Sequence, residues 1–231
     1  KEAVNQLCST PSSPGRKTTS IIEIHTNAPS FMKLKDEMQM WRANAASNGV
    51  ELFVFTILRE PVNWAVSAFN YHYRRKGKMC CRDATNEELR AVALHNPQCT
   101  FLYRSETYRI AHRSQWLPKK KDYNALIHAM KEQIDLVGTT EHLQETTDVL
   151  KYLLDLPANY TFKQKNKSSD NAARLQIEPI MHENLTDETI QYHKSISLLD
   201  YQLYENTQTE WRVKWKRFPK ISADTSVKVI I

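Results

Sequence analysis

Short apolar segments alternate with longer amphipathic segments along this chain. The apolar segments cover residues 20–25, 52–58 and 134–137, and polar or turn-forming residues bound each of them. Short and continuously apolar segments are typical of parallel strands that are buried on both faces. Apolar residues at helical spacing fill other stretches, at 30–46, 61–75, 86–95, 123–132 and 141–154. Strands that alternate with helices predict an α/β fold, in which helices flank a central parallel sheet.

The C-terminal third of the chain predicts one long final helix. It begins near Thr186, with acidic residues in its first turn, and the basic residues at 214–217 lie in its last turn. This arrangement of charges suits the helix dipole. Residues 219–231 are expected to form an edge strand or a tail. Residues 80–121 show no strand pattern and predict helical insertions and loops, while the polar residues 158–183 predict a lid or a solvated loop.

Composition limits the class of protein more than it identifies the function. A chain of 231 residues can bury one sizeable core, so we expect a single domain over residues 1–231. The net charge of +6 suits an anionic ligand, although a basic surface that only aids solubility is at least as common. No stretch of about 20 apolar residues is present, so no segment of this sequence is expected to span a bilayer.

The junction at residues 58–61 carries the strongest functional signal. Arg59 ends an apolar, β-branched run, Pro61 opens a helix, and Ser67 follows eight residues after the arginine. The start of a helix offers unpaired N–H groups and a positive dipole end, and a guanidinium adds two parallel donors. The pattern therefore predicts a phosphate site. The alternative is that Arg59 only caps the strand or pairs with a surface carboxylate.

This segment resembles the 3′-phosphate-binding element of sulfotransferases that use 3′-phosphoadenosine 5′-phosphosulfate (PAPS), most closely that of the Golgi carbohydrate branch. Residues 134–143 are similar to the Val-Gly-x-Thr-Glu-x-Leu strand end of that family. Residues 166–168 resemble its Asn-Lys-Ser/Thr loop, and residues 200–204 its Asp-x-x-Leu-Tyr helix. The resemblance implies a sulfotransferase fold like that of P-loop NTPases. It implies that Arg59 and Ser67 hold the 3′-phosphate, with Lys167 as a further cofactor-binding residue.

One element of the family has no clear counterpart in this sequence. The family has an N-terminal loop that resembles Pro-Lys-x-Gly-Ser/Thr-Thr and supplies a lysine to the 5′-phosphosulfate. Residues 14–19 have a similar character and contain Lys17, but a strand pattern follows them where the family has a helix. We therefore expect that the true loop precedes Lys1 and is absent from this chain. Lys17 remains the candidate 5′-phosphate lysine within it.

Transfer of a sulfuryl group also needs a base that takes the proton of the acceptor hydroxyl. His25 is our first candidate, because it ends an apolar strand upstream of Arg59 and because the ordinary pKa of a histidine lies near neutrality. Glu23 is the alternative, and strand alternation places both side chains on one face. Parallel neighbouring strands would bring His25 and Arg59 to the same edge of the sheet. The alternative for His25 is an ordinary surface histidine.

Cysteines and glycosylation sequons indicate the secretory pathway. Four cysteines match no zinc pattern, and their even number permits disulfides. Sequons begin at Asn159, Asn166 and Asn184. We expect a protein of the Golgi lumen, attached to the membrane only through an anchor outside this chain, as in a type II membrane protein. The sequence does not specify the oligomeric state.

The expected reaction is sulfuryl transfer from PAPS to a hydroxyl of a carbohydrate, on a glycan or a glycoprotein, which leaves 3′-phosphoadenosine 5′-phosphate (PAP). We expect no metal and no nucleic acid partner. Tyrosine and small-molecule acceptors stay open. The alternative function is a non-catalytic module that binds an anionic glycan or a nucleotide on the same scaffold. A nucleotide kinase is disfavoured, because the sequence has no Gly-x-x-x-x-Gly-Lys-Ser/Thr loop. A standard dinucleotide-binding fold is disfavoured, because the sequence has no Gly-x-Gly-x-x-Gly motif.

Overall fold

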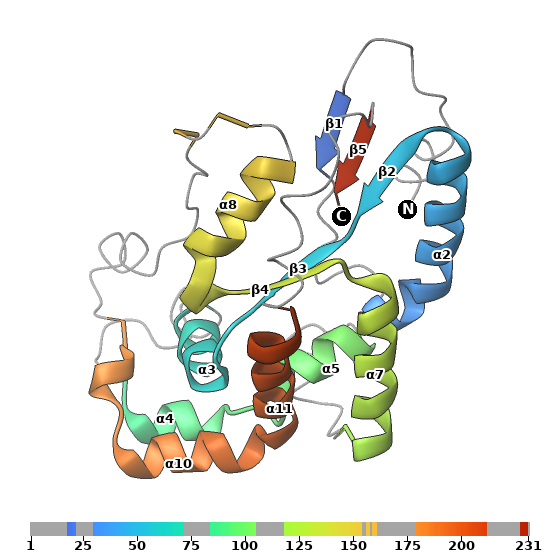
Figure 1. The fold of residues 1–231 in the computed structure, drawn as a ribbon. Coiled ribbons are helices and arrows are strands. Elements are labelled where there is room, and N and C mark those ends of the chain that lie inside the picture. Colours follow the sequence, from blue (N-terminus) through green and yellow to red (C-terminus); the bar gives the residue numbers. More distant parts are fainter. Residues whose placement is uncertain are drawn as a thin grey trace.

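The structure is a computed structural model, which places most of the central part of the chain (Figure 1). Side chains are not described at residues 18–21, 211 and 227–230, where only the backbone is placed. The described residues are 18–21, 30–71, 84–104, 118–153, 156–157, 159–160, 179–211 and 227–230.

The strands within these ranges form two parallel groups. The first is a sheet of three strands in the order β1 (Thr18–Ile21), β5 (Val227–Ile230), β2 (Val50–Phe53). The second is the parallel pair of β3 (Phe55–Leu58) and β4 (Leu136–Thr139). The predicted parallel pairing is confirmed. The prediction of an edge strand or a tail at residues 219–231 is wrong for β5, which lies between β1 and β2.

The predicted strand at residues 52–58 is two strands, because the chain changes partner at Val54. The N–H of Val54 donates to the Oδ2 atom of Asp135 at 2.8 Å, in place of a ladder hydrogen bond. Its carbonyl accepts from the backbone N–H groups of Asp135 at 2.9 Å and Leu136 at 3.2 Å. A side chain therefore takes over one strand contact at the point where β2 ends and β3 begins.

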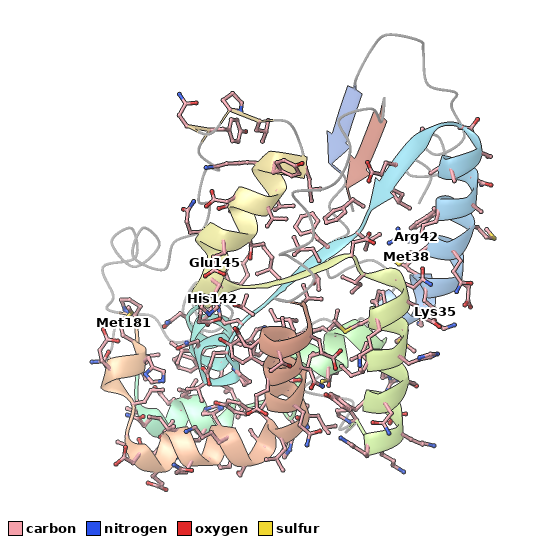
Figure 2. The ribbon with its side chains drawn as sticks, in the orientation of Figure 1. Lys35, Met38, Arg42, His142, Glu145 and Met181 are labelled. Atoms are coloured by element: carbon pink, nitrogen blue, oxygen red, sulfur yellow. The ribbon has the colours of Figure 1, made fainter. Side chains whose placement is uncertain are left out.

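Arg42 holds this break from helix α2 (Phe31–Ser47), where Figure 2 labels it. Its Nη2 atom lies 2.6 Å from Asp135 Oδ2 and donates to the carbonyl of Gln133 at 2.8 Å. Its Nη1 atom donates to the carbonyl of Leu52 at 3.0 Å. One guanidinium thus ties α2 to the end of β2 and to the residues just before β4.

Helices account for most of the described residues, so the structure is mixed α/β with a helical majority. Each predicted helix is present, with different ends. The predicted long final helix is wrong: it breaks at Ser197, where φ is −118° and ψ is 28°. No helix in the described ranges is long and apolar enough to cross a membrane. Besides α2, the helices are α3 (Pro61–Phe69), α4 (Asn86–Ala91), α5 (Pro97–Arg104), α7 (Lys120–Gln133), α8 (Leu143–Leu153), α10 (Asp187–Ile196) and α11 (Leu198–Asn206).

Helices cover both faces of the β3–β4 pair. Val137 packs into the main core with residues of α2 and α7, whereas its neighbour Leu136 packs against Leu150 and Leu153 of α8. Successive strand residues point to opposite faces, which explains the division. Figure 1 shows α7 and α8 on either side of the pair, with α3, α5 and α11 near the end of β3. β4 is therefore buried on both faces, as its apolar sequence predicts. The same prediction is wrong for β3, where only Leu58 is buried and Ile57 is 38% exposed.

Candidate anion site at the ends of β3 and β4

The parallel pairing of β3 with β4 brings together the two segments that follow these strands, around Arg59 and Thr140. Leu58 is opposite Thr139, so both strands end at the same edge of the sheet. Arg59 and Glu60 follow β3, and Thr140 begins the short 3-10 turn Thr140–His142 after β4. This is the carboxyl end of a parallel pair, where α/β proteins place their ligand sites.

Arg59 is held on two sides and lies partly buried. Its backbone N–H donates to the Oε1 atom of Gln98 at 2.9 Å, and its carbonyl accepts from Nε2 of Gln98 at 2.7 Å. On its side chain, Nε donates to the Oγ1 atom of Thr140 at 3.3 Å. Within the part of the chain that the structure describes, no carboxylate forms an ion pair with the guanidinium and its two terminal nitrogens have no partner. The described surroundings therefore leave the two-pronged end of Arg59 available to an anion.

The start of α3 differs from the prediction. Glu60 caps the helix, and its Oε2 atom accepts a hydrogen bond from the N–H of Asn63 at 2.7 Å. The N–H of Glu60 donates to Oε1 of Glu141 at 3.2 Å, and Pro61 has no N–H to offer. The expectation of unpaired N–H groups at this helix start is therefore wrong at Glu60 and Asn63, whose N–H groups both have acceptors. The carboxylate of Glu60 already satisfies the positive end of the helix dipole, so an anion here depends on Arg59 instead.

Glu141 joins the ends of the two strands. Its Oε1 atom accepts from the backbone N–H of Glu60 at 3.2 Å, from the hydroxyl of Thr140 at 3.0 Å and from the side-chain amide of Asn63 at 3.5 Å. Its Oε2 atom accepts from the hydroxyl of Tyr204 at 3.1 Å. Both carboxylate oxygens are thus engaged, and Glu141 organises the site more than it offers a free base.

Two tyrosines of α11 complete the edge. The hydroxyl of Tyr201 donates a hydrogen bond to Oε1 of Glu60, and the hydroxyl of Tyr204 donates one to Oε2 of Glu141. Burial, followed by the hydrogen bond to Glu60, raises the pKa of Tyr201 well above its ordinary value. Burial and the charge of Glu141 raise the pKa of Tyr204 to about 12. Both hydroxyls therefore keep their protons at neutral pH and act as donors. We call Glu60, Glu141, Tyr201 and Tyr204 the carboxylate–tyrosine cluster.

The helices behind Arg59 are joined by a buried carboxylate. Asp200 has no exposed surface and accepts from the backbone N–H groups of Gln98 and Cys99, both at 2.8 Å. In return, Oδ1 of Asn96 accepts from the N–H groups of Leu199 at 2.7 Å and Asp200 at 3.2 Å. Burial raises the pKa of Asp200 to about 6, against the opposing effect of the two N–H donors. Asn96 has a φ of 44°, in the left-handed region that asparagine tolerates.

The remaining predicted site residues have different outcomes. Ser67 lies in α3 and is partly buried, and no hydrogen bond joins its hydroxyl to Arg59 in the described structure. His25, Glu23, Lys17 and Lys167 lie outside the described residues. Their predicted roles remain predictions. The strand that precedes His25 is not a direct neighbour of β2, because β5 lies between them. The expectation that the strands before His25 and Arg59 are direct neighbours is therefore wrong.

Sequence reasoning missed Gln98 and gave no separate role to Thr140, Glu141 or Tyr201. Thr140 and Glu141 belong to the Val-Gly-x-Thr-Glu pattern, so the signal for them was present. The signal at Gln98 was the Asn-Pro pair just before it, which is typical of a helix start. Nothing in the sequence indicated that its side chain reaches Arg59.

The described residues contain no group of three or more His, Cys, Asp or Glu side chains that could hold a metal ion. No protein-family model, curated protein or solved structure that was compared with this chain matches it. The geometry of the β3–β4 edge and the sequence motifs therefore carry the functional argument.

Proposed function

We propose that this protein is a PAPS-dependent sulfotransferase and that Arg59 binds the 3′-phosphate of the nucleotide. The observation that carries the proposal is the state of Arg59. It directly follows β3 at the carboxyl edge of a parallel pair, its Nε atom is held by Thr140, and its terminal nitrogens have no partner among the described residues. A planar, always-charged fork held in this way suits bidentate recognition of phosphate.

The fold is compatible with the proposal. Parallel strands with helices on both faces are the arrangement that the sulfotransferase resemblance implies. Three of the four resembling segments also meet: Arg59 and Glu60 come from the first, Thr140 and Glu141 from residues 134–143, and Tyr204 from residues 200–204. Segments that are far apart in the sequence thus contribute to one edge of the sheet.

In the proposed reaction, a sulfuryl group passes from PAPS to a hydroxyl of a carbohydrate acceptor, and PAP is released. Little covalent chemistry is asked of the protein, because positioning and electrostatic stabilisation dominate transfers of this type. Arg59 holds the nucleotide, and Ser67 and Lys167 are further candidate contacts. The base is His25 or Glu23. We place the protein in the Golgi lumen, where the exposed sequon residue Asn184 would be accessible for glycosylation.

Calorimetric titration with PAP tests the proposal. Wild-type protein should bind PAP, and Arg59→Ala should weaken binding by roughly 100-fold, because charge-assisted hydrogen bonds to a phosphate are lost and no helix N-terminus compensates. Lys35→Ala is the matched control, since it removes the same charge from α2, in an exposed pair with Asp36. Absence of PAP binding by the wild-type protein would overturn the proposal.

The second candidate is a binding module on the same scaffold that transfers nothing. The engagement of Glu60 and Glu141 favours it, because the described part of the site supplies a grip for phosphate and no free base. Radiolabelled PAPS separates the two candidates. Sulfate transfer to glycan acceptors identifies the enzyme, whereas PAP binding without transfer, in protein that includes any residues encoded before Lys1, identifies the binding module.

A further inference from the structure

Gln98 replaces a strand partner at Arg59, the residue that follows β3. Its side-chain amide both donates to and accepts from the backbone of Arg59, at 2.7 and 2.9 Å. This is the pairing that a neighbouring strand would make with one residue of a ladder. Gln98 as a whole is 6% exposed, so water does not easily replace these bonds. Gln98 thus continues the backbone hydrogen bonding of β3 by one residue, to Arg59, which is the candidate phosphate ligand.

The position of Gln98 is fixed from behind. Asp200 accepts from the backbone N–H groups of Gln98 and Cys99, and so closes the first turn of α5. Its carboxylate is completely buried. Asn96 binds the first turn of α11 in return. A continuous set of short hydrogen bonds therefore runs from α11 through the start of α5 to the backbone of Arg59.

We propose that Gln98 is a positioning residue, which holds Arg59 in the orientation that selects for a 3′-phosphate. The inference rests on the proposed function and deepens it. Gln98 fixes the backbone of Arg59, and Thr140 fixes Nε on the side chain. The conformational freedom that phosphate binding must still remove is then small, and a ligand group held in advance binds with a lower entropic cost. Gln98 itself contacts no ligand in this scheme.

The test compares PAP with adenosine 5′-monophosphate, which lacks the 3′-phosphate. Gln98→Met keeps the volume of the side chain and removes both hydrogen bonds to Arg59. We expect its affinity for PAP to fall roughly tenfold, while its affinity for adenosine 5′-monophosphate stays within about twofold of the wild-type value. A role in stability alone would not change the ratio of the two affinities. In sulfate-transfer assays, KM for PAPS should rise while kcat stays unchanged.

Gln133→Met is the matched control. Gln133 is buried to the same degree, at 5% exposed, and its Oε1 atom has no hydrogen-bond partner. The same substitution there should leave the ratio of affinities unchanged. Should Gln98→Met fail to fold, Gln98→Leu answers the same question, because it also removes both hydrogen bonds to Arg59 and adds no charge near the phosphate site. We expect the same loss of selectivity from it.

The possible outcomes separate this inference from the proposed function. Selective loss of PAP affinity in the folded Gln98 variant, with Gln133→Met unchanged, supports the inference. Wild-type selectivity in that variant, or an equal loss for both nucleotides, overturns the inference and leaves the proposed function intact. If the wild-type protein binds PAP no better than adenosine 5′-monophosphate, the proposed role of Arg59 fails, and the role of Gln98 fails with it.

Discussion

Asn96 caps the first turn of α11, which contains Asp200, and Asp200 caps the first turn of α5, which Asn96 directly precedes. Asn96 lies directly before α5 and accepts from the N–H groups of Leu199 and Asp200 in α11. Asp200 accepts from the N–H groups of Gln98 and Cys99 in α5. The four orphan N–H groups at a helix start normally need a local cap or water. Here two helices supply caps to each other, which fixes α5 and α11 together behind the candidate site.

Replacing Asp200 should therefore cost much of the stability of the protein. Asp200→Ala leaves two buried N–H groups without acceptors, and we expect a loss of about 3 kcal/mol in the free energy of unfolding. Urea denaturation measures it. Asp148→Ala, at an exposed position on α8, should change stability by less than about 0.5 kcal/mol. A loss below about 1 kcal/mol at Asp200 would contradict the reciprocal capping.

The pH dependence of stability should show two opposed contributions. Burial, together with the charge of Arg90, lowers the pKa of His193 from 6.5 to about 4, although Glu60 opposes the shift. Between pH 6.5 and about pH 4, His193 is protonated in the unfolded chain but not in the folded chain. The contribution of His193 to stability is therefore lost as the pH falls through this range. Burial raises the pKa of Asp200 from 3.8 to about 6, so its contribution is lost as the pH rises from about 4 to about 6.

We therefore expect the stability of the wild-type protein to vary little between about pH 4 and pH 6, because the two slopes cancel. Asp200→Asn should expose the histidine contribution, so that stability rises with pH over this range. His193→Leu should expose the opposite slope. Each slope can reach about 1.4 kcal/mol per pH unit. Urea denaturation at several pH values measures both, and variants with slopes of the same sign would contradict the prediction.

Gly138 should not tolerate a side chain. An added Cβ atom would lie 2.5 Å from Oγ1 and 2.6 Å from Cγ2 of Thr146, because α8 packs directly on β4. We expect Gly138→Ala to cost about 2 kcal/mol, since a buried strand and a helix must separate. Thermal unfolding measures the change. Gly138→Ala should cost less stability in a protein that already carries Thr146→Ala than in the wild-type protein, because the clashing atoms are gone. An equal cost in both backgrounds would argue against this contact as the cause.

The Arg42–Asp135 pair should matter more than an ordinary surface pair. The two side chains are 30% and 32% exposed, so solvent screens the charges in part, but Arg42 also binds two backbone carbonyls. We expect Arg42→Met to cost about 1 to 2 kcal/mol by urea denaturation. Disrupting the exposed Lys35–Asp36 pair with Lys35→Ala should cost close to nothing. Equal effects at both positions would show that the carbonyl contacts add no stability.

The sequence predicted those parts of the fold that depend on local patterns. The apolar run before Arg59, with proline two residues later, led to β3 and α3 in the expected places. The break at Val54 and the break at Ser197 depend on tertiary partners, Asp135 in one case and the Asn96 cap in the other. The central position of β5 has the same origin, because strand order depends on contacts between residues far apart in the sequence.

The candidate site shows the same division. Arg59 could be identified from residue type and spacing alone. The blocked start of α3 could not, because the effect of Glu60 as a cap depends on the orientation of its side chain. Gln98 lies 39 positions from Arg59, in a segment with no functional motif, and only the fold brings its amide to the end of β3.

The most direct test of the account is the coupling between Arg59 and the 3′-phosphate. Calorimetry on wild-type protein and Arg59→Ala, each with PAP and with adenosine 5′-monophosphate, completes a thermodynamic cycle. The account predicts that the wild-type protein prefers PAP by roughly 100-fold and that Arg59→Ala loses nearly all of this preference. An equal preference for PAP in both proteins would contradict the assignment of Arg59 as the phosphate ligand.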